Sequence, residues 1–179
     1  MKRYESQNSK FLFNVYLPTT EGTSEVDVMI ICEKGILVFE SKNYSGWIFG
    51  DENKRMWTQT LAASNSKVEK TQFYNPVMQN STHIKHLKNL IGDDLPIYSV
   101  IVFSDRCVLK NIKVKFQDTY VIKRNDLTNI ISEIYDKQSK KIELQIIENV
   151  YNSLYSYTQI NEKTKKQHIF NVSKKKNEP

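Results

Sequence analysis

One stretch of this chain, residues 26–46 with the sequence VDVMIICEKGILVFESKNYSG, constrains its fold more than any other. It contains two apolar runs separated by the short polar sequence EKG. Apolar runs of this length, joined by a turn that carries a glycine, predict a β-hairpin. The second run ends in the charged sequence ESK, so the hairpin brings charged side chains to the end of a hydrophobic strand.

The predicted hairpin places three charged side chains together. Glu40 and Lys42 project to the same face because side chains alternate along a strand, and Asp27 lies on the neighbouring strand. Charges at this position are costly unless the protein uses them. Two carboxylates beside an ammonium group suit a divalent metal ion and a water held against a phosphodiester. The backbone carbonyl of Ser41 is a further candidate ligand, and Glu25 is expected to share the face of Asp27.

The same residues allow simpler interpretations. The E-x-K pattern is common, and at a strand end it usually forms an ion pair. Gln79 and His83 fall on a predicted helix, where they would be ordinary polar residues at the boundary of the core. His83 and His86 are three residues apart and could bind zinc, although the sequence offers no convincing third ligand.

The hydrophobic pattern predicts an α/β fold with a mixed central sheet covered by helices. The first helix is expected after Asn75-Pro76, a typical N-cap and first helical residue, and is expected to stop at Gly92. Residues 62–71 are expected to form an exposed loop. Strands are predicted at residues 11–17, 26–32, 36–39, 47–49, 56–61, 97–103, 114–116 and 120–122, and later helices after Asn125 or Asp126 and at about 142–157.

Composition and charge divide the chain into two parts. Its 179 residues, 39% of them hydrophobic, predict one soluble, cytoplasmic domain over residues 1–160 with no membrane segment and two reduced cysteines. The net charge is +6, but residues 161–179 carry six lysines and two glutamates and so contribute +4 of it. This basic tail is a candidate for contacts with DNA phosphates through Lys174, Lys175 and Lys176. The alternatives are a solvated terminus, or a short apolar strand formed by His168, Ile169, Phe170 and Val172.

Several motifs follow one another along residues 11–104. They are the D…E-x-K set, the turn sequence KNYSG at residues 42–46, Trp57, and the helix start N-P…Q…H at Asn75, Pro76, Gln79 and His83. Together they resemble the nuclease-related domain family, also called NERD, which is placed in the PD-(D/E)xK restriction-endonuclease-like superfamily. The resemblance implies a mixed sheet flanked by helices, a site for Mg²⁺ or Mn²⁺ at the hairpin, and DNA as the partner.

The resemblance also implies roles for single residues. Asp27 and Glu40 would hold the metal with the Ser41 carbonyl and Glu25, and Lys42 would position a water. Gln79 would orient the substrate or Lys42, and the candidate substrate-binding residues are Asn43, Tyr44 and His83. Family members usually begin with a helix that carries an acidic residue, whereas here only residues 1–9 precede the first strand and Glu5 is their sole acid. A shortened N-terminus predicts a site completed poorly, by a homo-oligomer or a partner chain, or not at all.

The leading hypothesis is therefore a divalent-metal-dependent nuclease acting on DNA. A catalytically impaired nucleic-acid-binding module with the same fold is the first alternative. The second is a protein-interaction domain, with ten tyrosines, eight phenylalanines and two tryptophans available for an interface. Tyr44, Trp47 and Phe49 follow the site and could stack on bases, but Trp47 and Phe49 are expected in the core.

Overall fold

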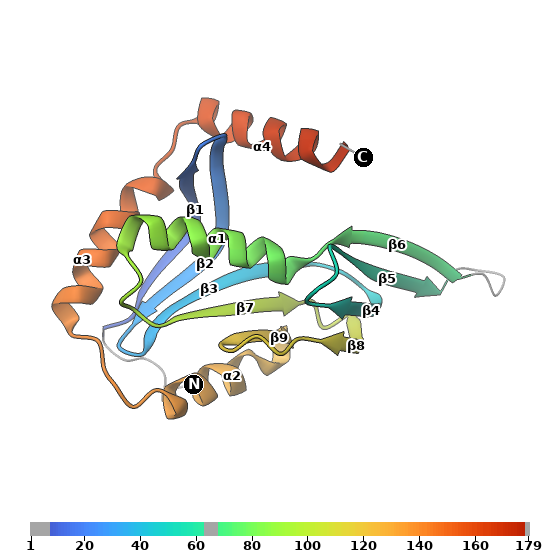
Figure 1. The fold of residues 1–179 in the computed structure, drawn as a ribbon, viewed down its shortest axis with the longest axis horizontal. Coiled ribbons are helices and arrows are strands. Elements are labelled where there is room, and N and C mark those ends of the chain that lie inside the picture. Colours follow the sequence, from blue (N-terminus) through green and yellow to red (C-terminus); the bar gives the residue numbers. More distant parts are fainter. Residues whose placement is uncertain (1–7, 63–67, 178–179) are drawn as a thin grey trace.

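Two β-sheets and four α-helices make up the computed structural model, which describes residues 8–62 and 68–177 (Figure 1). The central sheet has the order β1-β2-β3-β7-β9, formed by β1 (Lys10–Thr19), β2 (Gly22–Cys32), β3 (Gly35–Lys42), β7 (Ile97–Phe103) and β9 (Thr119–Lys123). The first three strands are antiparallel and the last three are parallel, so the sheet is mixed. The predicted α/β class with a mixed sheet is confirmed.

A second sheet, called the wing below, has the order β6-β5-β4-β8. Its strands are β4 (Gly46–Asp51), β5 (Met56–Ala62), β6 (Val68–Tyr74) and β8 (Cys107–Lys113). The β5–β6 hairpin extends away from the helices in Figure 1. The helices are α1 (Pro76–Ile91), α2 (Leu127–Lys137), α3 (Leu144–Tyr155) and α4 (Glu162–Asn177), with short 3₁₀ turns at Arg124–Asp126 and Ser156–Thr158.

The predicted β2–β3 hairpin is present, with Cys32 paired to Gly35 at its turn. Gly35 has a φ of 140°, and an added Cβ atom would lie 2.5 Å from the carbonyl oxygen of Pro96. Any residue other than glycine would therefore have a strained backbone conformation here, and its Cβ atom would clash with the carbonyl oxygen of Pro96, just before β7. The glycine at the turn thus allows the Cys32–Gly35 pairing of the hairpin and the close packing of the chain before β7 against it.

The central sheet is covered on both faces. On one face, Met29 and Val38 pack with Leu87 of α1 and with Ile147 of α3. On the other face, residues such as Leu37 pack with Ile134 of α2. The α1 side chain of Asn80 is fully buried and donates hydrogen bonds to the Val38 carbonyl and the Ser99 hydroxyl, both at 2.9 Å, and so ties α1 to β3 and β7.

Several expected elements differ from the structure. The strand expected at residues 114–116 is wrong, because the chain pairs with β4 through β8 at Cys107–Lys113 instead. The described part of the expected loop at residues 62–71 is strand, since β5 ends at Ala62 and β6 begins at Val68. Residues 63–67 lie outside the described residues, as does Glu5. The apolar strand considered at His168–Val172 is also wrong, since this segment belongs to α4. No helix in the described ranges is long and apolar enough to cross a membrane.

Replacing Asn75 with alanine is expected to lower the free energy of unfolding by about 2–4 kcal/mol. The buried Asn75 side chain accepts hydrogen bonds from the amides of Val77 and Met78, and it donates to carbonyls at three positions of the β4–β5 turn, Asp51, Glu52 and Lys54. Its loss removes a helix cap and leaves carbonyls without that donor.

Urea unfolding of the Asn75→Ala protein checks this expectation. Asn75→Asp keeps the cap acceptor and removes only the donor, so it separates the two contributions. Asn149→Ala, at an exposed asparagine on α3, is the matched control. A loss for Asn75→Ala no larger than that of the control would contradict the proposed role.

Candidate functional site

Charged and polar side chains from β2, β3 and the first half of α1 lie together near the C-terminal end of β3. β3 supplies Glu40 and Lys42, two residues apart and therefore on one face. α1 supplies Gln79 and His83, four residues apart and therefore also on one face. The Asn75 cap and the docking of Asn80 fix how α1 presents this face to the sheet.

Glu40 is the centre of this group and only 3% of its surface is exposed. One carboxylate oxygen accepts a hydrogen bond from Lys42 Nζ at 2.5 Å, and the other lies 3.2 Å from His83 Nε2. Lys42 Nζ also donates to Gln79 Oε1 at 3.0 Å. Glu40, Lys42, Gln79 and His83 therefore lie together, and Gln79 contacts Lys42, one of the two partners considered for it from the sequence.

Asp27 joins the group through the backbone of β3. Its Oδ2 accepts a hydrogen bond from the Ser41 amide at 2.8 Å. The carbonyl of Lys42 accepts from Ser104 on the β7 side, and consecutive residues of a strand direct their backbone groups to opposite sides. The Ser41 carbonyl is therefore inferred to face the same gap as Asp27.

The two carboxylates experience different electrostatic environments. Burial raises the pKa of Asp27, and the negative charge of Glu40 adds to this effect against the opposing hydrogen bond from Ser41. Burial also acts to raise the pKa of Glu40, but the hydrogen bond with His83 and the ammonium group of Lys42 outweigh it and hold the pKa below its ordinary value of 4.5. Glu40 is thus kept ionised, whereas at Asp27 the positive charge of Lys42 does not outweigh burial and the negative charge of Glu40.

The lowered pKa of Glu40 predicts an acid-dependent contribution to stability. A carboxyl group with a depressed pKa in the folded state stabilises that state above its unfolded pKa, and the stabilisation is lost as pH falls through the folded pKa. The difference in unfolding free energy between the wild type and Glu40→Gln should therefore be constant near neutral pH and shrink below about pH 4.5. Urea unfolding across pH 3–7 measures this difference, and a pH-independent difference would contradict the assignment.

Glu25 is not where strict alternation places it. Ser24 contacts His83 of α1, whereas the next residue, Glu25, contacts His168 of α4 at 3.4 Å. Val26 and Met29, three residues apart, both enter the same core cluster, so the alternation shifts between them. Opposite this point on β1, Asn14 has a φ of 50°. Glu25 therefore contacts α4, although its negative charge still adds to the raised pKa of Asp27, so its place beside a metal at Asp27 stays a prediction.

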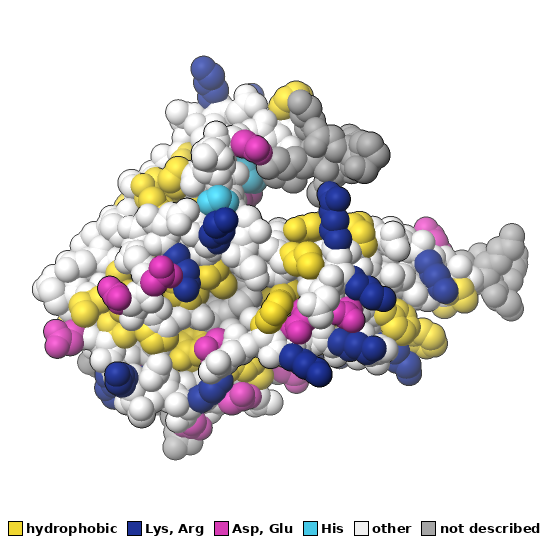
Figure 2. All heavy atoms as spheres, in the orientation of Figure 1, with side chains coloured by type: hydrophobic (Ala, Val, Ile, Leu, Met, Phe, Trp, Pro, Cys, Tyr) yellow, Lys and Arg dark blue, Asp and Glu magenta, His cyan; other side chains and the backbone are white. Residues whose placement is uncertain are grey.

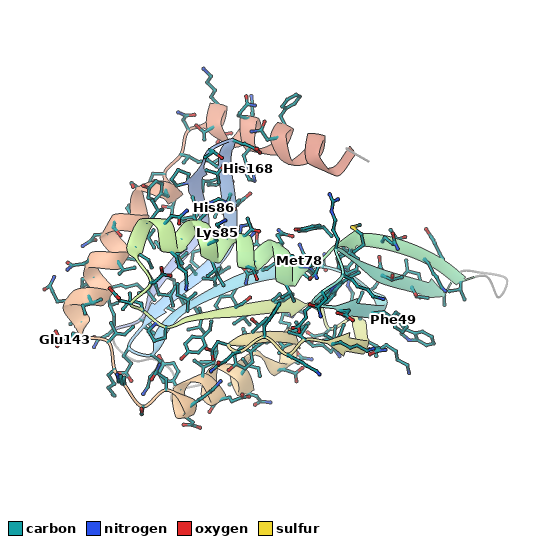
Figure 3. The ribbon with its side chains drawn as sticks, in the orientation of Figure 1. Phe49, Met78, Lys85, His86, Glu143 and His168 are labelled. Atoms are coloured by element: carbon teal, nitrogen blue, oxygen red, sulfur yellow. The ribbon has the colours of Figure 1, made fainter. Side chains whose placement is uncertain are left out.

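Glu25 belongs instead to a separate cluster between β1, β2 and α4. Its carboxylate accepts from the Tyr16 hydroxyl, and burial together with Glu25 raises the pKa of Tyr16 to about 12. His168 Nδ1 lies 3.0 Å from the Thr23 hydroxyl, and its ring packs edge-on against Tyr16. Figure 3 shows His168 on α4, across from α1.

The remaining predicted substrate-binding residues are placed differently from one another. Asn43 lies at the edge of the site, where its Oδ1 accepts a hydrogen bond from Arg106 at 2.8 Å. Tyr44 stacks on Phe73, with ring centroids 4.4 Å apart, and is partly buried with the core beneath the wing. Its ring face is therefore engaged by protein rather than open to a base. Lys174, Lys175 and Lys176 lie on α4, but their side chains are outside the described part of the chain, so their contact with phosphates stays a prediction.

Two residues of the site escaped the sequence analysis. The hydroxyl of Ser24 lies 2.6 Å from His83 Nδ1 and fixes the ring that contacts Glu40. Arg106 adds a cation beside Asn43. No spacing rule could reveal either contact, because each joins residues more than 55 positions apart that only the packing of α1 and β8 brings together.

The donor set fits a hard divalent cation better than zinc. Asp27 and Glu40 offer carboxylate oxygens, and each Glu40 oxygen keeps a lone pair beyond its one hydrogen bond. Within residues 8–62 and 68–177 no three or more His, Cys, Asp or Glu side chains are grouped to hold a metal. Mg²⁺ commonly binds through one or two carboxylates and keeps several waters. The zinc alternative is not supported, because both ring nitrogens of His83 contact other side chains.

Comparisons with known proteins support the motif analysis. A protein of Bacillus anthracis, described only as uncharacterized, is 32% identical over 170 residues, which cover 94% of this chain and 76% of that protein. No solved structure matches the chain. The family model of the nuclease-related domain matches residues 1–104, the segment that contains Asp27, Glu40, Lys42, Gln79 and His83. The chain therefore belongs to the nuclease-related domain family.

Proposed function

We propose that this protein is a nuclease that uses Mg²⁺ or Mn²⁺ to hydrolyse phosphodiester bonds in DNA, with a site of the PD-(D/E)xK type. The observation that carries the proposal is the meeting of Asp27, Glu40 and Lys42 beside α1, within the segment that matches the family. A nuclease-related function for the family makes nucleic acid the expected substrate class.

In this proposal each residue of the site has its own role in hydrolysis. Asp27 and Glu40, with the Ser41 carbonyl, would hold the cation, which when bound polarises the phosphoryl group and lowers the pKa of water. Gln79 and Glu40 hold the Lys42 ammonium group in place. From there Lys42 would orient the attacking water and stabilise the negative charge that develops on the phosphate. His83 would hold the Glu40 carboxylate in position through its contact with Ser24.

The test is incubation of plasmid DNA and single-stranded DNA with the purified protein in Mg²⁺ or Mn²⁺, beside the Glu40→Ala protein prepared in the same way. We expect the wild type to cleave DNA in the presence of the metal. We expect no cleavage when EDTA is added and no cleavage by the Glu40→Ala protein. Equal cleavage by both proteins would point to a contaminating nuclease and would remove the support for the assignment.

A second candidate is a nucleic-acid-binding module that has the fold without turnover. The observation in its favour is that both oxygens of Glu40 already contact cationic or hydrogen-bonding partners, Lys42 and His83, which compete with a metal. DNA binding without cleavage, in any divalent metal, would favour this candidate.

A further inference from the structure

The outer face of the wing collects aromatic, apolar and cationic side chains. Trp47 pairs with Thr60 and Phe49 pairs with Thr58, and side chains that are directly opposite share a face. Thr60 also pairs with Lys70 of β6, which extends the same face across three strands. These residues line a shallow groove of about 470 Å³, whose full lining is Trp47, Phe49, Thr58, Thr60, Val68 and Lys70.

This face is exposed, contrary to the expectation that Trp47 belongs to the core. Trp47 is 50% exposed and Val68 is 60% exposed, and Val108, which pairs with Trp47, is 49% exposed. The opposite face of the wing carries the buried Ile48 and Trp57. The expectation failed because alternation directs Ile48 inward and leaves its neighbours outward. Contiguous exposed apolar surface of this kind marks an interaction site.

The cations of this face complement a polyanion. Lys110 Nζ lies over the Trp47 ring, 5.3 Å from its centroid, and Lys70 lines the groove beside Val68. The six residues that line the groove include a lysine and no carboxylate. Glu69 precedes Lys70 on β6 and pairs with Leu61. Because side chains alternate along a strand, the Glu69 side chain is directed to the opposite face. Figure 2 shows hydrophobic side chains and lysine or arginine side chains next to one another on the wing, and Figure 3 labels Phe49 on β4.

We propose that the outer face of the wing binds single-stranded nucleic acid, with bases stacked on Trp47 and Phe49 and phosphates paired with Lys70 and Lys110. Surfaces for single strands combine aromatic side chains on which bases stack with cations that follow the backbone. A duplex keeps its bases stacked on one another and cannot use the aromatic rings in this way. The inference rests on the proposed nuclease function, for which it names the form of the substrate.

The wing is placed to serve the candidate site. β4 begins at Gly46, four residues after Lys42, so the strand that carries Trp47 and Phe49 continues directly from the strand of the site. Gln59 donates a hydrogen bond to the Ser45 carbonyl at 2.8 Å and fixes the connection between them. A nucleic-acid strand bound on the wing would therefore be bound by an element that follows β3 directly in the chain.

The experiment measures binding of a fluorescein-labelled single-stranded oligothymidylate by anisotropy, using Glu40→Ala protein in EDTA so that nothing is cleaved. Adding Trp47→Ala to this protein should weaken binding by about 5- to 150-fold, because one stacked base contributes about 1–3 kcal/mol. Trp47→Phe should retain most of the affinity. Lys70→Glu with Lys110→Glu should weaken binding and reduce its salt dependence, since fewer counterions are released.

The chain provides its own controls. Phe13 is 58% exposed on β1, so Phe13→Ala removes a similarly exposed aromatic residue from the other sheet and should leave binding unchanged. Trp57 is 1% exposed and stacks parallel to Phe103, so its emission reports whether the Trp47 variants remain folded. In the Trp47-containing protein, oligothymidylate should quench the emission of the exposed tryptophan, and Trp47→Phe should abolish that quenching.

Three results would overturn the inference. The first is that Trp47→Ala and Phe13→Ala weaken oligothymidylate binding equally. The second is that duplex DNA binds with the same affinity as the single strand and that Trp47→Ala lowers both affinities equally. The third is self-association of the protein that Trp47→Ala removes while oligothymidylate binding is unaffected, which would make this face a protein interface. Trp47-dependent binding by a wild type that cleaves nothing would refute the proposed nuclease function and would still support this inference.

Discussion

Asp27→Asn, Glu40→Gln and Lys42→Ala are each expected to lower metal-dependent DNA cleavage by at least about 10³-fold, because residues that act as a unit in catalysis each remove most of the rate when lost. Glu40 contacts Lys42 directly, and Asp27 is held at the amide of the residue between them. The substitutions keep side-chain size close to the original at the two acids, so the fold should persist. Initial rates of cleavage of a labelled oligonucleotide, with circular dichroism of each protein, measure the effect.

Double variants should show that Glu40 and Lys42 act as a unit. Glu40→Gln with Lys42→Ala should cleave barely more slowly than either single variant, since the first change already disables the unit. Lys10→Ala and Glu148→Gln are matched controls, because these residues form a surface ion pair at 2.7 Å and should leave the rate unchanged. Independent, multiplicative losses at Glu40 and Lys42 would contradict a shared catalytic role.

Replacing His83 with alanine is expected to lower the cleavage rate by about 10- to 100-fold, the loss typical of a residue that orients a metal-binding side chain. His83 is 7% exposed, contacts Glu40 at 3.2 Å and is held by Ser24 at 2.6 Å. Its loss would free one Glu40 oxygen to rotate away from the site. A titration of the rate against Mn²⁺ concentration should show that part of the loss is recovered at high metal concentration.

His168 provides the control for that experiment. Its ring contacts the Thr23 hydroxyl and the Glu25 carboxylate much as His83 contacts Ser24 and Glu40, but it lies on α4. His168→Ala should therefore leave cleavage and its Mn²⁺ dependence unchanged, apart from any loss of stability. A loss of activity in His168→Ala as large as that in His83→Ala would show that histidine contacts to this hairpin matter only for folding.

Local sequence signals were sufficient for the centre of the site and for its supporting helix. The glycine turn at Gly35 fixed the register of β2 and β3, and alternation along β3 then placed Glu40 beside Lys42. The Asn75 cap fixed where α1 begins and hence which face carries Gln79 and His83. These are local rules, and the structure obeys them where the backbone is regular.

The failures occurred where the outcome depends on long-range packing. The alternation of β2 shifts opposite Asn14, and Glu25 contacts His168 of α4, which no local pattern indicates. β8 pairs with β4 across more than 50 residues of sequence, so no local pattern could predict the wing or the outward direction of Trp47. The contact of Tyr44 with Phe73 likewise depends on how the wing folds against α1.

Electron paramagnetic resonance of Mn²⁺ titrated into the metal-free protein, in the absence of DNA, shows whether Asp27 and Glu40 form a metal site. The wild type and Lys42→Ala should bind Mn²⁺, and Asp27→Asn and Glu40→Gln should bind it at least about tenfold more weakly, since each loses a charged ligand. Equal Mn²⁺ affinity in the wild type, Asp27→Asn and Glu40→Gln would contradict a metal site at these two carboxylates.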